Sequence, residues 1–285
     1  MIRLVVFVLV LTSVLGCTKR TEKENTPAKP VDTLPQPEPE YEIRPPVLTP
    51  VTKNINEAIG GYYVGLPAKY NSTIKSYPLL MFIHGGGGFG NGQLDLPALL
   101  NEGIPELYDE KIFPPDFEVG DKHFSFIMMA PQLRRNPANE ELYSFIRYAQ
   151  QNYRIDSSRI YLVGMSNGGR ITCNVAAAYP LLFAAIVPMA GVPDSSGLES
   201  KTSIIAESKL PIWIFHNDSD EVINIRLPIR FVESVNNFKP AIKPRFTRFE
   251  QPMGLLGHDA WTRATNPQYR ENNTNIYEWM LSYHR

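Results

Sequence analysis

The sequence has few cysteines and no excess of charge of one sign. Only two of its 285 residues are cysteines, Cys17 and Cys173, which excludes a disulfide-stapled scaffold and a zinc site built from cysteines. Its 28 basic side chains are balanced by 29 acidic ones, for a formal net charge of -1. Without a basic stripe for phosphate backbones, no nucleic acid partner is expected. The fold must therefore be stabilised by its apolar core.

Long apolar runs are also scarce, and the clearest one lies at the N-terminus. Arg3 precedes an apolar run over residues 4–15, which is too short for a permanent membrane span but typical of a signal peptide. The run ends in VLGC at positions 14–17, which resembles the lipobox of bacterial lipoproteins. We expect residues 1–16 to be a lipoprotein signal peptide and Cys17 to be lipidated, with an ordinary secretory signal as the alternative. Both interpretations predict an exported protein.

The next segment is rich in proline and polar residues. Residues 18–50 contain eight prolines and few apolar side chains. Such a stretch buries too little apolar surface to offset the entropy of ordering, so we expect residues 17–50 to be the lipidated cysteine and a disordered tether. The protein would then be membrane-anchored through its lipid, on the periplasmic or cell-surface side. Residues 51–285 are expected to form a single folded domain of unknown oligomeric state.

Strand-like and helix-like patterns alternate after residue 50. Short runs of β-branched and aromatic residues predict strands at 62–66, 79–83, 124–130, 160–163, 184–189 and 212–215, and helical spacing predicts helices at 140–149, 171–178 and 276–283. Alternation of buried strands with helices is typical of the α/β class. We therefore expect a mainly parallel central sheet flanked by helices on both faces.

A serine lies in a predicted turn from strand to helix. Residues 164–168 read GMSNG, so Ser166 is the centre of a G-x-S-x-G motif between the strand at 160–163 and the helix at 171–178. Such a turn is strained, and only glycine on either side lets the strand and the helix pass so closely. The turn exposes the hydroxyl at the N-terminus of the helix. This context indicates that Ser166 is a nucleophile.

A serine nucleophile needs a base, and His258 is the best-placed histidine. Of the other four, His84 lies beside a glycine loop, His123 opens a strand on the far side of the sheet, His216 ends a strand and His284 is the penultimate residue. His258 follows a glycine on a loop between the last strand and the last helix. Such a loop at the carboxyl edge of the sheet can present an imidazole to the serine.

The acid of a triad is expected between the serine and the histidine in the chain. Asp220 follows the strand at 212–215 and fits the order of nucleophile, acid and base. Asp218, in the same turn, and Asp194, after the preceding strand, are the alternatives. Asp218 can instead cap the turn through its side chain. The expected role of the acid is to hold the imidazole tautomer and to stabilise the imidazolium.

Four glycines, Gly85–Gly88, come directly after a predicted buried strand. Without side chains, their backbone N–H groups can approach a ligand closely. With the N–H of Asn167 they can form an oxyanion hole, in which Gly86 is the favoured donor and Gly85 or Gly87 the alternative. A phosphate-binding loop is the competing interpretation, but the glycine spacing of such loops is missing.

These motifs resemble those of the α/β-hydrolases, and specifically of the secreted esterases grouped with polyhydroxybutyrate depolymerases, feruloyl esterases and predicted peptidases of the prolyl-oligopeptidase type. The resemblance is carried by residues 63–67 with 77–86, by 128–132, by 164–169, and by 216–222 with 257–261. It implies the α/β-hydrolase fold, with Ser166 as nucleophile, Asp220 as acid, His258 as base, and Gly86 and Asn167 as oxyanion donors.

One position departs from that family's pattern. Asn217 follows His216 where the family commonly has glycine. Because asparagine tolerates left-handed backbone geometry better than other non-glycine residues, we expect the turn that carries Asp220 to persist.

The resemblance also implies an activity. It implies hydrolysis of a carboxylic ester through an acyl-enzyme on Ser166, without a metal or an organic cofactor. Export and the likeness to feruloyl esterases favour a small-molecule or glycan-linked feruloyl or acetyl ester as substrate. A serine peptidase of the prolyl-oligopeptidase type and a non-catalytic binding protein on the same fold are the alternatives. The insertion at 91–121 is expected to shape the pocket, and Trp261 either lines that pocket or packs in the core.

Overall fold

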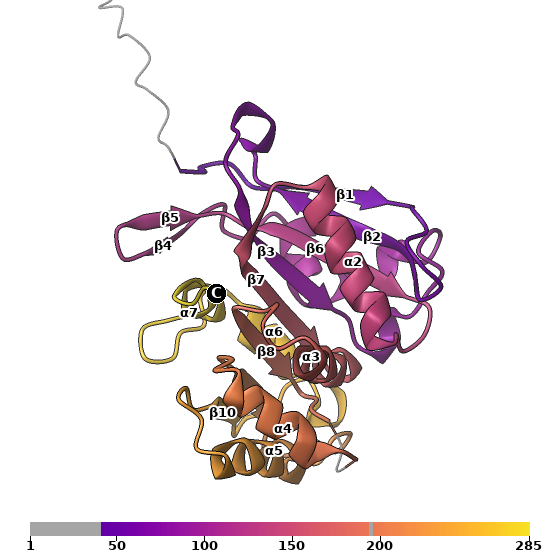
Figure 1. The fold of residues 1–285 in the computed structure, drawn as a ribbon. Coiled ribbons are helices and arrows are strands. Elements are labelled where there is room, and N and C mark those ends of the chain that lie inside the picture. The colour runs from indigo at the N-terminus through magenta and orange to yellow at the C-terminus, as the bar shows by residue number, and fades with distance from the viewer. Residues whose placement is uncertain (1–40, 194–195) are drawn as a thin grey trace, which may run out of the picture. The chain divides into compact units, whose positions relative to one another are not determined.

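The computed structural model describes residues 41–193 and 196–285 of the chain. The predicted signal peptide, Cys17, most of the predicted tether and Asp194 lie outside the described residues. The described part contains an eight-stranded sheet with the strand order β1-β2-β6-β3-β7-β8-β9-β10 (Figure 1). Pairing is parallel from β6 to β10 and antiparallel for β1 with β2 and for β2 with β6.

The bounds of the elements are as follows. The strands are β1 (Val47–Val51), β2 (Ile59–Leu66), β3 (Tyr77–Ile83), β6 (Ile127–Leu133), β7 (Ile155–Met165), β8 (Ala185–Met189), β9 (Trp213–Asn217) and β10 (Arg245–Phe249), with a separate hairpin of β4 (Phe117–Val119) and β5 (Lys122–Phe124). The helices are α1 (Ile104–Asp109), α2 (Asn139–Asn152), α3 (Asn167–Ala178), α4 (Leu198–Glu207), α5 (Arg226–Asn237), α6 (Trp261–Thr265) and α7 (Ile276–Leu281). Short 3-10 turns include η2 (Gly86–Gly88), η3 (Leu96–Asn101) and η4 (Leu255–Gly257).

Helices cover both faces of the sheet, as β3 illustrates. Its alternate residues Leu79 and Met81 pack into one hydrophobic cluster, which contains the buried side chains of α2, α3, α4 and α5. The residues between them, Leu80 and Phe82, pack into a second cluster with η3, α1, α6 and α7. Because successive strand residues point to opposite faces, both faces of β3 are buried. The predicted α/β fold with a mainly parallel sheet is therefore confirmed.

Helix α2 shows how the sequence pattern produces this arrangement. Its buried residues Leu142, Phe145, Ile146 and Ala149 have spacings of three and four and lie on one face. At the first turn, Glu141 accepts a hydrogen bond from the Ala138 N–H at 2.7 Å, which satisfies a donor that the helix leaves unpaired. The helix predicted at 140–149 is thus present, and slightly longer than predicted.

The predicted boundary of the domain at residue 51 is wrong. Residues 47–51 form β1, which pairs with β2 from Val47 opposite Leu66 to Val51 opposite Tyr62. Further upstream, Glu42 is buried and accepts the Lys69 N–H at 3.1 Å. The prolines that indicated a tether are compatible with β1 because it lies at the edge of the sheet, where a missing N–H donor leaves no ladder bond unmade.

A second difference concerns His123. The strand expected over 124–130 begins at Ile127 as β6, and His123 lies instead in β5, paired with β4. Its ring nitrogen Nδ1 lies 2.6 Å from the Asp116 carboxylate. His123 therefore belongs to a hairpin that begins within the predicted insertion and ends just after it, and does not open a central strand.

The role of β1 can be tested by truncation. A chain that begins at Tyr41 is expected to be more stable than one that begins at Thr52, by about 2 kcal/mol or more, because the shorter chain exposes the apolar edge of β2. Urea denaturation measures this difference. A third chain that begins at Pro46 keeps β1 but loses Glu42, and so separates the two contributions. Equal stability of the chains that begin at Tyr41 and Thr52 would contradict the assignment of β1 to the domain.

Candidate active site

Ser166 lies in a sharp turn between β7 and α3. Its backbone has φ 52° and ψ -120°, a conformation that non-glycine residues rarely adopt. The Ser166 N–H donates to the Met189 carbonyl oxygen at 2.8 Å and so ties the turn to β8. Strain of this kind persists only where the surroundings enforce it, and it is concentrated at functional sites. The predicted turn from strand to helix at residues 164–168 is therefore present.

The two glycines of the motif are required by close backbone contacts. A Cβ atom on Gly164 would lie 2.3 Å from the carbonyl oxygen of Gly168. A Cβ atom on Gly168 would lie 2.1 Å from the carbonyl oxygen of Ile83 in β3. Because these obstacles are backbone atoms, they cannot move aside as a flexible side chain can. Helix α3 therefore passes β7 and β3 at separations that only glycine allows.

The structure brings Ser166, His258 and Asp220 together. The distance from Ser166 Oγ to His258 Nε2 is 2.8 Å, and that from His258 Nδ1 to Asp220 Oδ2 is also 2.8 Å. The three residues follow β7, β9 and β10, so the carboxyl ends of three parallel strands supply them. Since the carboxylate only accepts, His258 Nδ1 carries a proton and Nε2 is free to accept one from the serine.

The alternative acids do not occupy this position. Asp218 lies at the surface, where its Oδ1 accepts from Nε of Arg248 at 2.7 Å. Asp194 lies outside the described residues. The side chain of Asp220 is fully buried, and only 13% of the His258 side chain is exposed.

Four donors surround the Asp220 carboxylate. Oδ1 accepts the backbone N–H groups of Val222 at 2.9 Å and Ile223 at 2.8 Å. Oδ2 faces His258 and also His216, whose Nε2 lies 3.2 Å away. Burial raises the pKa of Asp220, but the hydrogen bonds from His258 and Ile223 outweigh it and hold this pKa below the ordinary value. The carboxylate therefore stays ionised at neutral pH.

His216 is a residue of the site that the sequence analysis did not find. It is completely buried, and its Nε2 lies 2.8 Å from the Ile223 carbonyl oxygen as well as near Asp220. Both neighbours are acceptors, so Nε2 carries the proton. Burial lowers the pKa of His216, and within the described part of the chain its Nδ1 has no hydrogen-bond partner. His216 is therefore a neutral donor to the Ile223 carbonyl, and its Nε2 faces Oδ2 of Asp220 from the buried side.

Asn217 acts differently from the expectation. It is the last residue of β9 and its φ is not positive, so a left-handed backbone is not why it is tolerated. Its Nδ2 donates instead to the Gly257 carbonyl oxygen at 2.7 Å. The Glu221 N–H donates to the Leu256 carbonyl at 3.0 Å. These two bonds join the loop that carries Asp220 to the loop that carries His258.

The glycine loop lies against the serine. A Cβ atom on Gly85 would be 3.4 Å from the Cβ of Ser166, whereas one on Gly86 would meet no atom within 4 Å. Gly86 begins the turn η2, and Asn167 is the first residue of α3, where helix geometry leaves the N–H without an intrahelical acceptor. His84 fixes the loop through Nδ1, 2.6 Å from the Gly85 carbonyl, while its Nε2 accepts a backbone N–H of β6.

A cavity of about 500 Å³ adjoins His258. Its lining residues are Asn101, Glu102, Glu106, Val222, Gly254, Leu255, Leu256, His258, Asp259, Trp261 and Thr262. The Trp261 ring meets the His258 ring edge-on at 5.3 Å between centroids, so Trp261 lines the pocket. The predicted insertion at 91–121 contributes Asn101, Glu102 and Glu106 to the lining.

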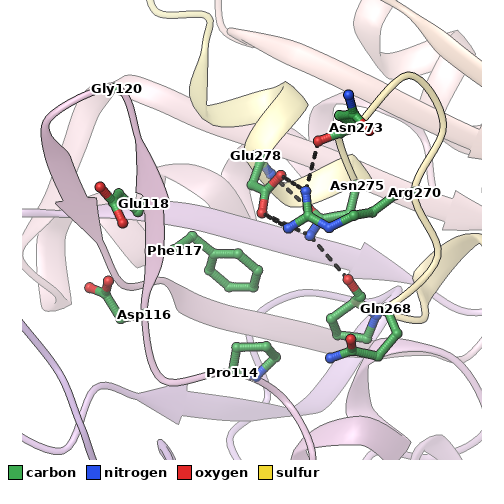
Figure 2. Close-up of a pocket in the computed structure, with 11 residues that line it drawn as sticks. Pro114, Asp116, Phe117, Glu118, Gly120, Gln268, Arg270, Asn273, Asn275 and Glu278 are labelled. Carbon is green, nitrogen blue, oxygen red and sulfur yellow. Dashed lines mark hydrogen bonds and ion pairs between the residues drawn. The ribbon is translucent and has the colours of Figure 1, made fainter.

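Figure 2 shows another cavity, of about 610 Å³, beside the β4–β5 hairpin. Phe117 and Glu118 of β4 line it, together with Arg270, whose guanidinium pairs with the carboxylate of Glu278 in α7. None of the residues predicted from the motifs lines this cavity. Of the triad residues, His258 lines the cavity of about 500 Å³ and none lines this one, so the cavity at His258 is the one that adjoins the candidate site.

Two further properties bear on cofactors and membranes. Within residues 41–193 and 196–285, no group of three or more His, Cys, Asp or Glu side chains is arranged to hold a metal ion. In the same ranges no helix has the length and apolarity needed to cross a membrane.

Comparison with known proteins agrees with this architecture. Residues 122–263, about half of the chain, match a family model described as phospholipase/carboxylesterase. Over 50 residues the chain is 42% identical to acetylxylan esterase A of Aspergillus oryzae, a match that covers 18% of this chain and only 16% of that relative. With the sheet topology and the turn at Ser166, these findings show that the chain has the α/β-hydrolase fold.

Solved structures share the fold. A thermostable esterase superposes with a TM-score of 0.58 at 23% identity, over 84% of this chain and 63% of that one. A ferulic acid esterase gives a TM-score of 0.57 at 16% identity, over 79% and 97%. S-formylglutathione hydrolase from Staphylococcus aureus gives 0.57 at 14% identity, over 84% and 99%. These superpositions confirm the predicted α/β-hydrolase fold independently of the sheet topology.

The role of His216 can be tested with a matched pair of variants. His216→Gln keeps an amide donor near the position of Nε2, whereas His216→Met fills similar space without a donor. Because loss of the polar N–H that faces Oδ2 destabilises the carboxylate, the pKa of Asp220 is expected to be higher in His216→Met than in His216→Gln. Titration of the Asp220 carboxyl by ¹³C NMR measures both pKa values, and equal values would contradict a role of His216 in stabilising the carboxylate.

The same pair has a consequence for stability. A carboxylate whose folded-state pKa is depressed stabilises the fold above its ordinary pKa, and this stabilisation is lost as the pH falls through the depressed value. The loss of unfolding free energy between neutral and acid pH is therefore expected to be smaller in His216→Met than in His216→Gln. Urea denaturation at both pH values measures this loss. Because both variants lack His216, its own titration does not contribute to the difference between them.

Proposed function

We propose that this protein is a serine hydrolase that cleaves carboxylic esters. The observation that carries the proposal is the continuous contact from Ser166 Oγ through the His258 ring to Asp220, at a serine whose backbone is strained. The phospholipase/carboxylesterase family match supports the same class of reaction. A nucleophile, a base and an orienting acid within hydrogen-bond distance are what nucleophilic acyl transfer requires.

The reaction follows from this arrangement. As Ser166 Oγ attacks the ester carbonyl carbon, His258 Nε2 takes its proton, and the ionised Asp220 stabilises the imidazolium. The N–H groups of Gly86 and Asn167 stabilise the negative charge that develops on the carbonyl oxygen. The imidazolium then protonates the departing alcohol, which leaves an acyl group on Ser166. Water, deprotonated by His258, releases the acid and restores the serine.

The proposed substrate is an acetyl or feruloyl ester linked to a glycan. Its support is the local identity to acetylxylan esterase A and the expectation from the sequence that the protein is exported. The match covers only about a sixth of that relative's length. The proposed substrate therefore rests on the chemistry of the site as well as on this likeness. We propose further that Cys17 carries a lipid that anchors the protein to a membrane, on the strength of the apolar run and the VLGC sequence before residue 18.

Substitution of the nucleophile tests the proposal. The full chain is expected to hydrolyse p-nitrophenyl acetate, methyl ferulate or acetylated xylan, and Ser166→Ala to lower kcat/KM by about 10⁴ or more because no acyl-enzyme can form. Ser200→Ala, which changes an exposed serine on α4, is the matched control and is expected to leave the rate unchanged.

The alternatives give different results in the same assays. Faster turnover of chromogenic peptides than of all three esters would replace the esterase by a peptidase. Failure of a fluorophosphonate to label Ser166, together with no turnover of any substrate, would indicate a binding protein on the hydrolase fold.

A further inference from the structure

The cavity beside His258 is lined by two kinds of side chain. The acidic ones are Glu102, which follows η3, Glu106 of α1, and Asp259 next to the histidine. The apolar ones include Leu255 and Leu256 of η4, which are 86% and 50% exposed, and Val222, which is 54% exposed. Exposed apolar side chains gathered at one cavity are suited to contact with a ligand.

The cavity has no positive charge to balance its carboxylates. Among the described residues that line it there is no lysine and no arginine, and the remaining polar side chains are Asn101, Thr262, His258 and Trp261, whose indole N–H bonds to Glu102. Like charges at short range in a partly buried site repel more strongly than they do in water. A substrate that brings a carboxylate or a phosphate into this cavity therefore meets repulsion, with no cation to offset it.

Glu102 is the carboxylate nearest to the expected oxyanion hole. Its Oε1 lies 3.9 Å from the position that a Cβ on Gly87 would occupy, so it stands beside the glycine loop. Burial, together with the charges of Asp259 and Glu106, raises the pKa of Glu102. A bound group that donates hydrogen bonds to this carboxylate would replace the water lost on burial.

We propose that this cavity takes an uncharged, hydroxyl-bearing part of the ester, such as a neutral sugar, and excludes anionic esters, with Glu102 as the specificity-determining residue. The inference rests on the proposed ester hydrolysis and narrows its substrate class. Sugar hydroxyls donate to the carboxylates, and the C–H faces of the ring pack on Trp261 and on the two leucines. Esters of uronic acids are excluded because their carboxylate faces Glu102 and Asp259.

Three matched probes test this charge preference. They are the monoacetyl esters of methyl glucoside, methyl glucuronide and methyl glucosaminide, which differ in having no charge, a negative charge or a positive charge. We expect kcat/KM for the glucoside to exceed that for the glucuronide by about tenfold or more. We expect Glu102→Gln to reduce this ratio at least about threefold by removing one repelling charge.

Two further variants make the result specific. Glu118→Gln removes a carboxylate at the other cavity and is expected to leave the ratio unchanged. Glu106→Gln, at the same cavity as Glu102, is expected to change the ratio in the same direction by less, and provides the test if Glu102→Gln does not fold. A reduced ratio in the Glu102 and Glu106 variants but not in Glu118→Gln supports the proposal.

Other outcomes overturn it in distinguishable ways. Equal rates for the glucoside and the glucuronide, or an unchanged ratio in both Glu102→Gln and Glu106→Gln, refute the charge selection. Preference for the glucosaminide over the glucoside by more than about tenfold would make the carboxylates an ammonium site instead. Hydrolysis of p-nitrophenyl acetate without hydrolysis of any glycoside refutes the sugar subsite alone. Absence of turnover on p-nitrophenyl acetate as well refutes the proposed ester hydrolysis, and the inference with it.

Discussion

The left-handed backbone of Ser166, with φ 52°, is the constraint on which the site depends. It is maintained by the bond from the Ser166 N–H to Met189 and by the contacts that glycine alone permits at positions 164 and 168. Any other geometry would turn the hydroxyl away from His258 or separate α3 from β7. The packing of the central sheet therefore offsets the free-energy cost of the strained backbone. The same packing maintains the position of the nucleophile.

The acid and the base are positioned by a second set of contacts, which joins two loops far apart in the chain. Asn217 holds the backbone at Gly257, and the buried His216 ring bonds to the Ile223 carbonyl with its Nε2 3.2 Å from the Asp220 carboxylate. A neutral polar group beside the carboxylate leaves its negative charge available to the His258 ring. His216 and Asn217 thus support the site, and neither is expected to contact the substrate.

Local sequence patterns were enough to predict the fold and the residues that meet at the site. Strand periodicity and the G-x-S-x-G turn each depend on only a few neighbouring positions. β1 was missed because Pro50 and the prolines that precede the strand are typical of a tether, and only the edge position of β1 makes Pro50 acceptable. The contacts of His216 and Asn217, and the place of Glu102 in the cavity, depend on loops that approach from distant parts of the chain. No pattern along a single sequence specifies such approaches.

The measurement that tests the central claim most directly is the trapping of an acyl group on the protein. The full chain is mixed with p-nitrophenyl acetate, denatured by acid within the first turnover, and analysed by mass spectrometry of the intact protein and of its peptides. The account predicts the added mass of one acetyl group, located on Ser166, and no such mass on Ser166→Ala under the same conditions. Acetyl groups on lysines only, or on another serine, would contradict it.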